Sequence, residues 1–123
     1  MKFVVSSNTL LTRLQAVSKV IGGKPVQPIL DNILLVATEG VLYATASDKE
    51  TTMEARIELE SLEEEGKITI SAKILLDILK EFPEQPLTFE INTETNEVKI
   101  ISEKGEFSVP GESAEDYPIQ ARS

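Results

Sequence analysis

The 123-residue sequence predicts an α+β fold in which one βαβββ unit is used twice, placing two helices on one face of an antiparallel sheet. The first observation is an internal repeat. Residues 2–15 and 67–80, which start 65 positions apart, share one Lys, one Ser and three Leu at matching places. The second is that each copy reads as a strand, a capping serine and leucines at helical spacing. The third is that strand-like runs separated by turn residues follow each helix.

Each predicted helix has one face for the core and one face for solvent. The apolar stripes are Leu10, Leu14, Val17 and Ile21 with Leu11 at the edge, and Leu75, Leu79 and Phe82 flanked by Leu76 and Ile78. The opposite faces carry Thr12, Ala16 and Lys19 in the first helix, and Lys73, Asp77 and Lys80 in the second. Seven residues make nearly two turns, so Lys73 and Lys80 stack in one row. The second helix is predicted over residues 72–81, ending before Pro83.

The remaining elements are predicted to be antiparallel strands. Their ranges are residues 2–5, 29–37, 41–46, 52–59, 67–70, 87–92, 97–102 and 105–109. Apolar and polar residues alternate in 52–59, so one face of that strand meets the core and the other meets water. Residues 61–66 read as a charged connection. The pattern predicts a domain over residues 1–112, with repeats at 2–60 and 67–109, followed by a linker at 113–123 that leads to a further domain.

The composition argues against ordinary catalysis. The sequence has no cysteine and no histidine, which removes disulfides, thiolate chemistry and the commonest general base and metal ligand. No metal site and no cofactor are predicted. A hydrolase that uses Asp48 or Glu54 is one functional class to weigh. However, these carboxylates and Glu50 lack a defined ligand spacing, and they read as part of a solvated turn and strand. No apolar run approaches membrane-spanning length, and a cytoplasmic location is predicted.

Charge is unevenly distributed along the chain. The formal net charge is −9, but residues 1–30 contain four basic residues and no acid, whereas residues 31–123 contain 8 basic and 21 acidic residues. The acid-free first helix makes Arg13 and Lys19 candidates for contact with an anion such as DNA. The alternative is that this imbalance is simply tolerated on a solvated helix.

Two further stretches have more than one reading. The loop Gly22-Gly23-Lys24-Pro25 is not a Walker loop, because it lacks the first glycine and the Ser/Thr. It reads as a helix C-cap and hinge that leaves Lys24 free to reach a phosphate. In the last strand, Phe107 and Val109 point the same way. They either face a partner chain at a sheet edge or pack inward on the core of this domain.

These features together resemble a known family. The resemblance of the chain to this family rests on four stretches: the initiating Met-Lys-Phe, the loop at residues 22–25 followed by Pro28-Ile29-Leu30-Asp31-Asn32, the segment 72–83, and Asp116-Tyr117-Pro118. The chain is similar over residues 1–120 to the N-terminal domain of bacterial sliding clamps, the beta subunits of DNA polymerase III. The resemblance implies the DNA clamp fold. It also implies a non-catalytic head-to-tail homodimeric ring of six like domains, which encircles double-stranded DNA without sequence specificity and tethers the replicative polymerase.

The resemblance also implies roles for individual residues. Lys24 matches the basic loop position that contacts DNA in relatives, and Lys73 and Lys80 match basic positions of the second pore helix. Phe107 and Val109 match the apolar pair that meets the third domain of the neighbouring subunit. The polymerase and the clamp loader are expected to bind other domains.

The sequence departs from the pattern of these relatives in two places. Glu103 and Glu106 stand near the last strand where some relatives are basic, and Ile74 is apolar on a helix face predicted to be exposed. The polar partners across the interface are therefore expected to differ. The alternative function is a stand-alone acidic adaptor domain that binds a protein partner through its edge strand and never meets DNA.

Overall fold

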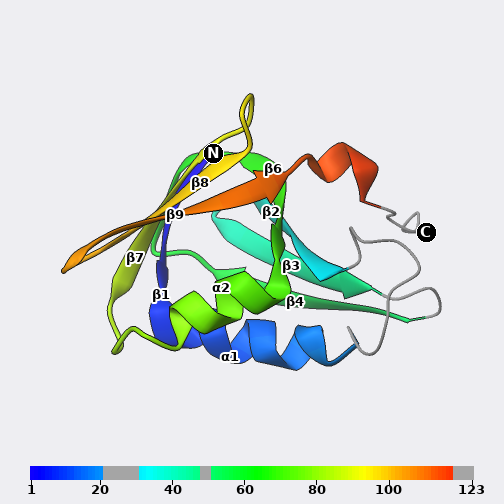
Figure 1. Cartoon of the computed structure of the whole chain (residues 1–123), viewed down its shortest axis with the longest axis horizontal. Helices are drawn as coiled ribbons and strands as arrows, with labels where there is room; N and C mark the ends of the chain where they lie inside the picture. The colour runs from blue at the N-terminus through cyan, green and yellow to red at the C-terminus, as the bar shows by residue number, and fades with distance from the viewer. Residues whose placement is uncertain (21–30, 48–50, 118–123) are drawn as a thin grey trace.

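The computed structural model describes residues 1–20, 31–47 and 51–117 (Figure 1). The first half contains β1 (Lys2–Ser6), α1 (Ser7–Val17), the 3-10 helix η1 (Ser18–Val20), β2 (Asn32–Thr38), β3 (Val41–Ser47), β4 (Thr52–Glu58) and β5 (Ser61–Glu64). The second half contains β6 (Gly66–Ser71), α2 (Ala72–Leu79), β7 (Pro86–Asn92), β8 (Glu97–Ser102), β9 (Gly105–Glu112) and the 3-10 helix η3 (Ala114–Asp116).

The nine described strands form one antiparallel sheet in the order β4-β3-β2-β6-β9-β8-β7-β1-β5. The two halves of the sheet meet where β6 pairs with β9, and this pairing has only two residue pairs, Thr69 with Glu112 and Ile70 with Gly111. Every other neighbouring pair of strands has a longer register. The sheet therefore consists of two well-paired portions joined by a short seam.

Both helices begin at the predicted serines. The Ser6 side chain accepts a hydrogen bond from the backbone N–H of Thr9, and the Ser71 side chain accepts one from that of Ile74, which are N-cap contacts. The buried faces contain Leu10 and Leu14 in α1 and Leu75 and Leu79 in α2. The two helices contact each other and lie side by side below the sheet (Figure 1). The predicted α+β architecture, with both helices on one side of antiparallel sheet, is confirmed.

One continuous hydrophobic core lies between this helix pair and the sheet. Phe3 on β1 and Phe89 on β7 stack with their ring centroids 5.0 Å apart and their planes 9° apart. The strand pairing brings these two residues directly opposite each other. A stacked aromatic pair of this kind contributes about 1 kcal/mol beyond the burial of its area. Because β1 belongs to the first repeat and β7 to the second, the core joins both repeats into one unit.

The structure differs from the sequence prediction at residues 61–66. Ser61–Glu64 forms the strand β5, which pairs with β1 and lies at one end of the sheet. Its single large apolar residue, Leu62, packs against the core, while Glu63 and Glu64 stay exposed. Short, charged edge strands are a common way to prevent further strand pairing. The charge of this segment therefore suits an edge strand as well as it suits a connection.

Ordered structure also continues past residue 112. Ala114 and Tyr117 are buried against Leu34 and the partly buried Val36, in a second small cluster on β2. The Tyr117 hydroxyl donates a hydrogen bond to the carbonyl oxygen of Thr45 at 3.4 Å, and burial raises the pKa of this phenol. The folded unit therefore extends to Tyr117, and the predicted linker remains a prediction for residues 118–123, which lie outside the described residues. No helix in the described ranges is long and apolar enough to cross a membrane.

Candidate nucleic-acid interface

Four of the five predicted cations lie exposed on the two helices or at their ends. Arg13 on α1, Lys19 on η1, Lys73 on α2 and Lys80 at the C-cap of α2 are all exposed. None of these four cations forms an ion pair within 4.0 Å with any residue that the structure describes. Their charges therefore remain available to a large anion. We call these four residues the helix-pair cations.

Asp77 lies among the cations of α2 and is exposed with them. It lies four residues after Lys73 and three residues before Lys80, and both spacings place side chains on neighbouring positions of one helix face. The carboxylate is nevertheless more than 4.0 Å from either ammonium group, as no such ion pair is formed. Lys73, Asp77 and Lys80 together therefore carry a net charge of +1, and neither lysine is paired with the aspartate.

Hydrogen bonds fix the two helices relative to each other. The backbone N–H of Ser7, at the start of α1, donates to the carbonyl oxygen of Gln85 at 2.9 Å. In return, the Gln85 N–H donates to the Ser7 hydroxyl at 3.0 Å, and that hydroxyl donates to the Pro83 carbonyl oxygen at 3.1 Å. The Ser6 hydroxyl donates to the Glu84 carboxylate at 2.8 Å. Since residues 83–85 come shortly after α2, which ends at Leu79, these bonds hold the two helices in a set arrangement.

Arg56 is a further exposed cation near α1 that was not predicted as a site residue. A surface depression of about 430 Å³ next to α1 is lined by Thr9, Arg13, Arg56, Ile57 and Glu58. Arg56 on β4 therefore adds a second arginine beside Arg13, while Glu58 offsets part of its charge. In the sequence, Arg56 occupies an ordinary polar position of an alternating strand, so the pattern gave no signal for it. Lys24, the predicted loop contact, lies outside the described residues.

Phe107 and Val109 on β9 have different environments. Val109 is 2% exposed and belongs to the hydrophobic core of this domain. Phe107 is 41% exposed, and its ring meets that of Phe82 edge to face, with centroids 5.4 Å apart. Ile74 on α2 is also exposed, at 42%. The structure therefore leaves Phe107 available to a partner, whereas the Val109 side chain is used inside the domain.

The backbone of β9 is open along part of its length. Residues 105–110 pair with β8 on one side, whereas β6 meets β9 only at Gly111 and Glu112. Within the described chain, the other side of residues 105–110 has no strand partner. Unpaired backbone groups on a strand beside an exposed aromatic side chain are typical of a site for strand pairing with another chain.

The comparisons with known proteins agree with this geometry. The family model described as "DNA polymerase III beta subunit, N-terminal domain" matches residues 1–121. The beta sliding clamp of Vibrio harveyi is 36% identical over 119 residues, which are 96% of this chain and 81% of that sequence. The beta sliding clamp of Proteus mirabilis is 38% identical over 120 residues, which are 96% of this chain and 32% of that sequence.

A solved structure gives the same result at the level of the fold. The DNA polymerase III subunit beta of Pseudomonas aeruginosa superimposes with a TM-score of 0.91 at 29% sequence identity, covering 100% of this chain and 33% of that one. The chain thus spans about a third of the length of the Proteus and Pseudomonas proteins. Sequence and structure together show that the chain belongs to the DNA polymerase III beta subunit family and corresponds to its N-terminal domain.

Proposed function

We propose that this chain acts as the first domain of a DNA sliding clamp, a non-catalytic ring that keeps DNA polymerase III on double-stranded DNA. The observation that carries the proposal is the helix pair. Two helices in contact expose Arg13, Lys19, Lys73 and Lys80, and none of the four is neutralised by a described residue. In the ring, this face lines the central hole, together with Lys24 on its loop. Such a protein works in the cytoplasm of a bacterial cell.

The chemistry of this face suits a protein that moves along DNA. Contacts from Lys and Arg to phosphates are independent of sequence, whereas sequence is read by side chains that reach base edges in a groove. Flexible cations on a helix surface can exchange one phosphate for the next at little cost. The acidic remainder of the chain, with 21 acidic and 8 basic residues in 31–123, repels DNA from other surfaces. Retention then comes from encirclement rather than from tight adhesion.

The open side of β9 supports the proposed ring closure. The third domain of a neighbouring subunit pairs with residues 105–110 and covers Phe107. Val109 acts indirectly, by holding β9 on the core. The strand β4, at the far end of the sheet order, pairs only with β3 among the described strands and offers a second open edge. Two different open edges suit a head-to-tail association, which closes into a ring.

The polymerase and the clamp loader bind domains beyond this chain in the proposed protein, and residues 118–123 lead toward them. The open β9 edge equally favours a second candidate function, an acidic adaptor that binds a protein partner and does not meet DNA. The two candidates differ in what the helix-pair cations do. They are required for retention on DNA by a clamp and are dispensable for an adaptor.

The test is charge reversal in the whole protein. We expect the triple substitution Lys24→Glu, Lys73→Glu and Lys80→Glu to weaken loading and retention on nicked circular DNA while the dimer stays intact. The matched control is Lys67→Glu, because Lys67 is an exposed lysine on β6, between strand residues rather than on a helix. Loss of retention in the triple variant but not in the control supports the clamp. Unchanged retention in the triple variant would favour the adaptor.

A further inference from the structure

Gln85 is a buried polar residue that bonds to three separate parts of the fold. It lies between α2 and β7 and is 8% exposed. Its backbone N–H donates to the Ser7 hydroxyl at 3.0 Å, and its carbonyl oxygen accepts from the Ser7 N–H at 2.9 Å. Its side-chain Oε1 accepts from the Glu103 N–H at 2.9 Å, and its Nε2 donates to the Pro83 carbonyl oxygen at 3.3 Å. One residue thus joins the start of α1, the segment after α2 and the turn between β8 and β9.

The local sequence explains why a side chain is needed at this point. The pairing of β7 with β8 ends at Thr88 and Ile101, although β7 itself begins at Pro86. Proline has no N–H to donate, so Pro86 cannot complete a further pair of a regular ladder. The Glu103 N–H, two residues beyond Ile101, is instead bonded by the Gln85 side chain. Gln85 therefore extends the contact with the β8–β9 hairpin past the last backbone pair.

This hairpin carries the open edge of the sheet. Within the described chain, one side of residues 105–110 has no strand partner, and Phe107 is 41% exposed. Glu103 lies in the turn directly before this stretch. The contact between the rings of Phe82 and Phe107 is a second tie from the segment after α2. A strand bonded on one side opens locally with ease, so contacts at its turn decide how well its geometry is set before a partner binds.

We propose that Gln85 is a positioning residue for the subunit interface: it holds the Glu103 turn and so fixes the open edge of β9 relative to the helix pair. The inference rests on the proposed function, since it takes residues 105–110 as the edge that a neighbouring subunit pairs with. Gln85 acts through β9 and does not itself contact that subunit. A strand already held in its binding geometry loses less conformational freedom on association, and this raises affinity.

The experiment compares two substitutions in the whole protein. Gln85→Met keeps the approximate volume of the side chain and removes both hydrogen-bonding groups, whereas Gln85→Glu keeps an acceptor for the Glu103 N–H. In both variants the Pro83 carbonyl oxygen retains the Ser7 hydroxyl as a donor. We expect Gln85→Met to raise the dimer dissociation constant about tenfold and Gln85→Glu to raise it less than about threefold, because only the first loses the positioned turn. Sedimentation over a dilution series measures both.

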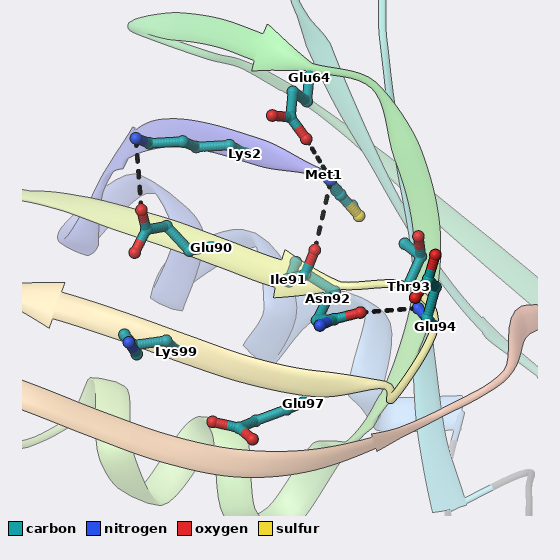
Figure 2. A pocket seen from close by; sticks show the side chains of 10 residues that line it. All are labelled: Met1, Lys2, Glu64, Glu90, Ile91, Asn92, Thr93, Glu94, Glu97 and Lys99. Atoms are coloured by element: carbon teal, nitrogen blue, oxygen red, sulfur yellow. Dashed lines mark hydrogen bonds and ion pairs between the residues drawn. The ribbon is translucent and has the colours of Figure 1, made fainter.

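Asn92 provides the matched control. Its Oδ1 accepts hydrogen bonds from the Glu94 N–H at 2.9 Å and the Thr95 N–H at 3.2 Å, in the turn between β7 and β8 (Figure 2). Asn92→Ala therefore removes the same kind of bond from a turn at the other end of β8. We expect it to lower the urea midpoint but to leave the dimer dissociation constant within about twofold. An equal rise of that constant in Asn92→Ala and Gln85→Met would overturn the proposal, because general destabilisation would then explain both.

Amide hydrogen exchange reports on the turn itself. We expect the Glu103 amide to exchange at least about tenfold faster in Gln85→Met than in the wild type, and at nearly the wild-type rate in Gln85→Glu. Unchanged exchange in Gln85→Met would contradict a turn held by this side chain. Should Gln85→Met not fold, Gln85→Asn replaces it, because its side chain is one methylene shorter and keeps its polarity. The same rises in exchange and in the dissociation constant are expected.

Phe107→Ala separates this inference from the proposed function. If Phe107→Ala weakens the dimer and Gln85→Met does not, the positioning role is wrong and the proposed interface stands. If neither substitution weakens the dimer, closure of the ring through β9 is wrong, and the role of Gln85 is wrong with it. Weakening by both, with rescue in Gln85→Glu, supports the proposal.

Discussion

The ring of Phe107 meets the ring of Phe82 edge to face, with centroids 5.4 Å apart and planes at 80°. This contact packs β9 against the segment that follows α2. The open strand edge is therefore in contact with the end of the second cationic helix. Phe107 still leaves 41% of its surface exposed. The same side chain therefore serves the domain on one side and is free for a partner on the other.

The first prediction concerns this pair in the whole protein. We expect Phe107→Ala to raise the dimer dissociation constant about tenfold or more, because a central aromatic contact is lost. Its effect on the stability of the domain should be smaller, since an edge-to-face pair contributes about 1 kcal/mol. Sedimentation over a dilution series measures the first effect and urea unfolding the second. A dimer unaffected by dilution would show that Phe107 serves only its own domain.

Lys73 should contribute one phosphate contact to the salt dependence of DNA binding by this chain. Each phosphate contact contributes a slope of about −0.9 to the logarithm of affinity against the logarithm of salt concentration. We expect Lys73→Gln to reduce the slope by about one and to weaken binding on every sequence alike. Lys67→Gln is the control and should leave the slope unchanged. Titrations on two unrelated linear duplexes at several salt concentrations provide the measurement, and a sequence-selective loss would contradict the proposed contacts.

Gly111 lies at the seam between the two portions of the sheet. A Cβ added there would lie 2.7 Å from the carbonyl oxygen of Asn96 and 3.1 Å from that of Thr69, and both are backbone atoms. We therefore expect Gly111→Ala to lower the free energy of unfolding by about 2 kcal/mol. Ser108→Ala, at an exposed position of the same strand, should change it by less than about 0.5 kcal/mol. Equal effects in urea unfolding would show that the seam tolerates a side chain.

A polar cluster that is buried at Asn32 and Thr69 crosses the same seam. Nδ2 of Asn32 donates to the Thr69 hydroxyl at 3.1 Å and to the Glu112 carboxylate at 3.0 Å, and that hydroxyl donates to the Glu112 carbonyl oxygen at 3.1 Å. We expect Asn32→Ala to cost about 2 kcal/mol, because a buried hydroxyl loses its donor. Asn8→Ala, at an exposed position on α1, should have little effect. Similar unfolding midpoints for the two variants would show that this cluster does not stabilise the fold.

Glu65 links stability to pH. Its carboxylate accepts hydrogen bonds from the Glu39 N–H at 2.7 Å and the Thr38 hydroxyl at 3.0 Å, and these bonds lower the pKa of Glu65 below its ordinary value of 4.5. A lowered folded pKa means that the stabilisation is complete above the unfolded pKa and is lost as the pH falls through the folded pKa. We expect Glu65→Gln to flatten the loss of stability below pH 4.5, whereas Glu60→Gln should not. Parallel acid profiles for the wild type and Glu65→Gln would contradict this.

The sequence predicted the helices well because their signals are local. A capping serine and a leucine stripe depend only on neighbouring residues, and Ser6 and Ser71 perform this role in both repeats. The strand β5 was missed because a short, charged edge strand resembles a connection until its partner, β1, is known. Likewise, the local sequence does not predict that Tyr117 packs on β2, because the apolar residues around it follow neither a helical nor a strand periodicity.

Alternation along a strand also has a limit. It correctly places Phe107 and Val109 on one face of β9, opposite Ile100 and Val98 of β8. It cannot say where the core ends along that face. Val109 lies over the core at 2% exposure, and Phe107 lies nearer the hairpin end, at 41% exposure with its ring against that of Phe82. This boundary is set by tertiary packing, and it decides which residue is available to a partner.

The most direct measurement is the lifetime of the whole protein on a nicked circular duplex before and after a single cut elsewhere in the circle. If the helix-pair cations line a hole around the DNA, the protein stays on the circle and leaves rapidly once a free end exists, because weak phosphate contacts alone do not hold it. The same lifetime on cut and uncut DNA would contradict encirclement.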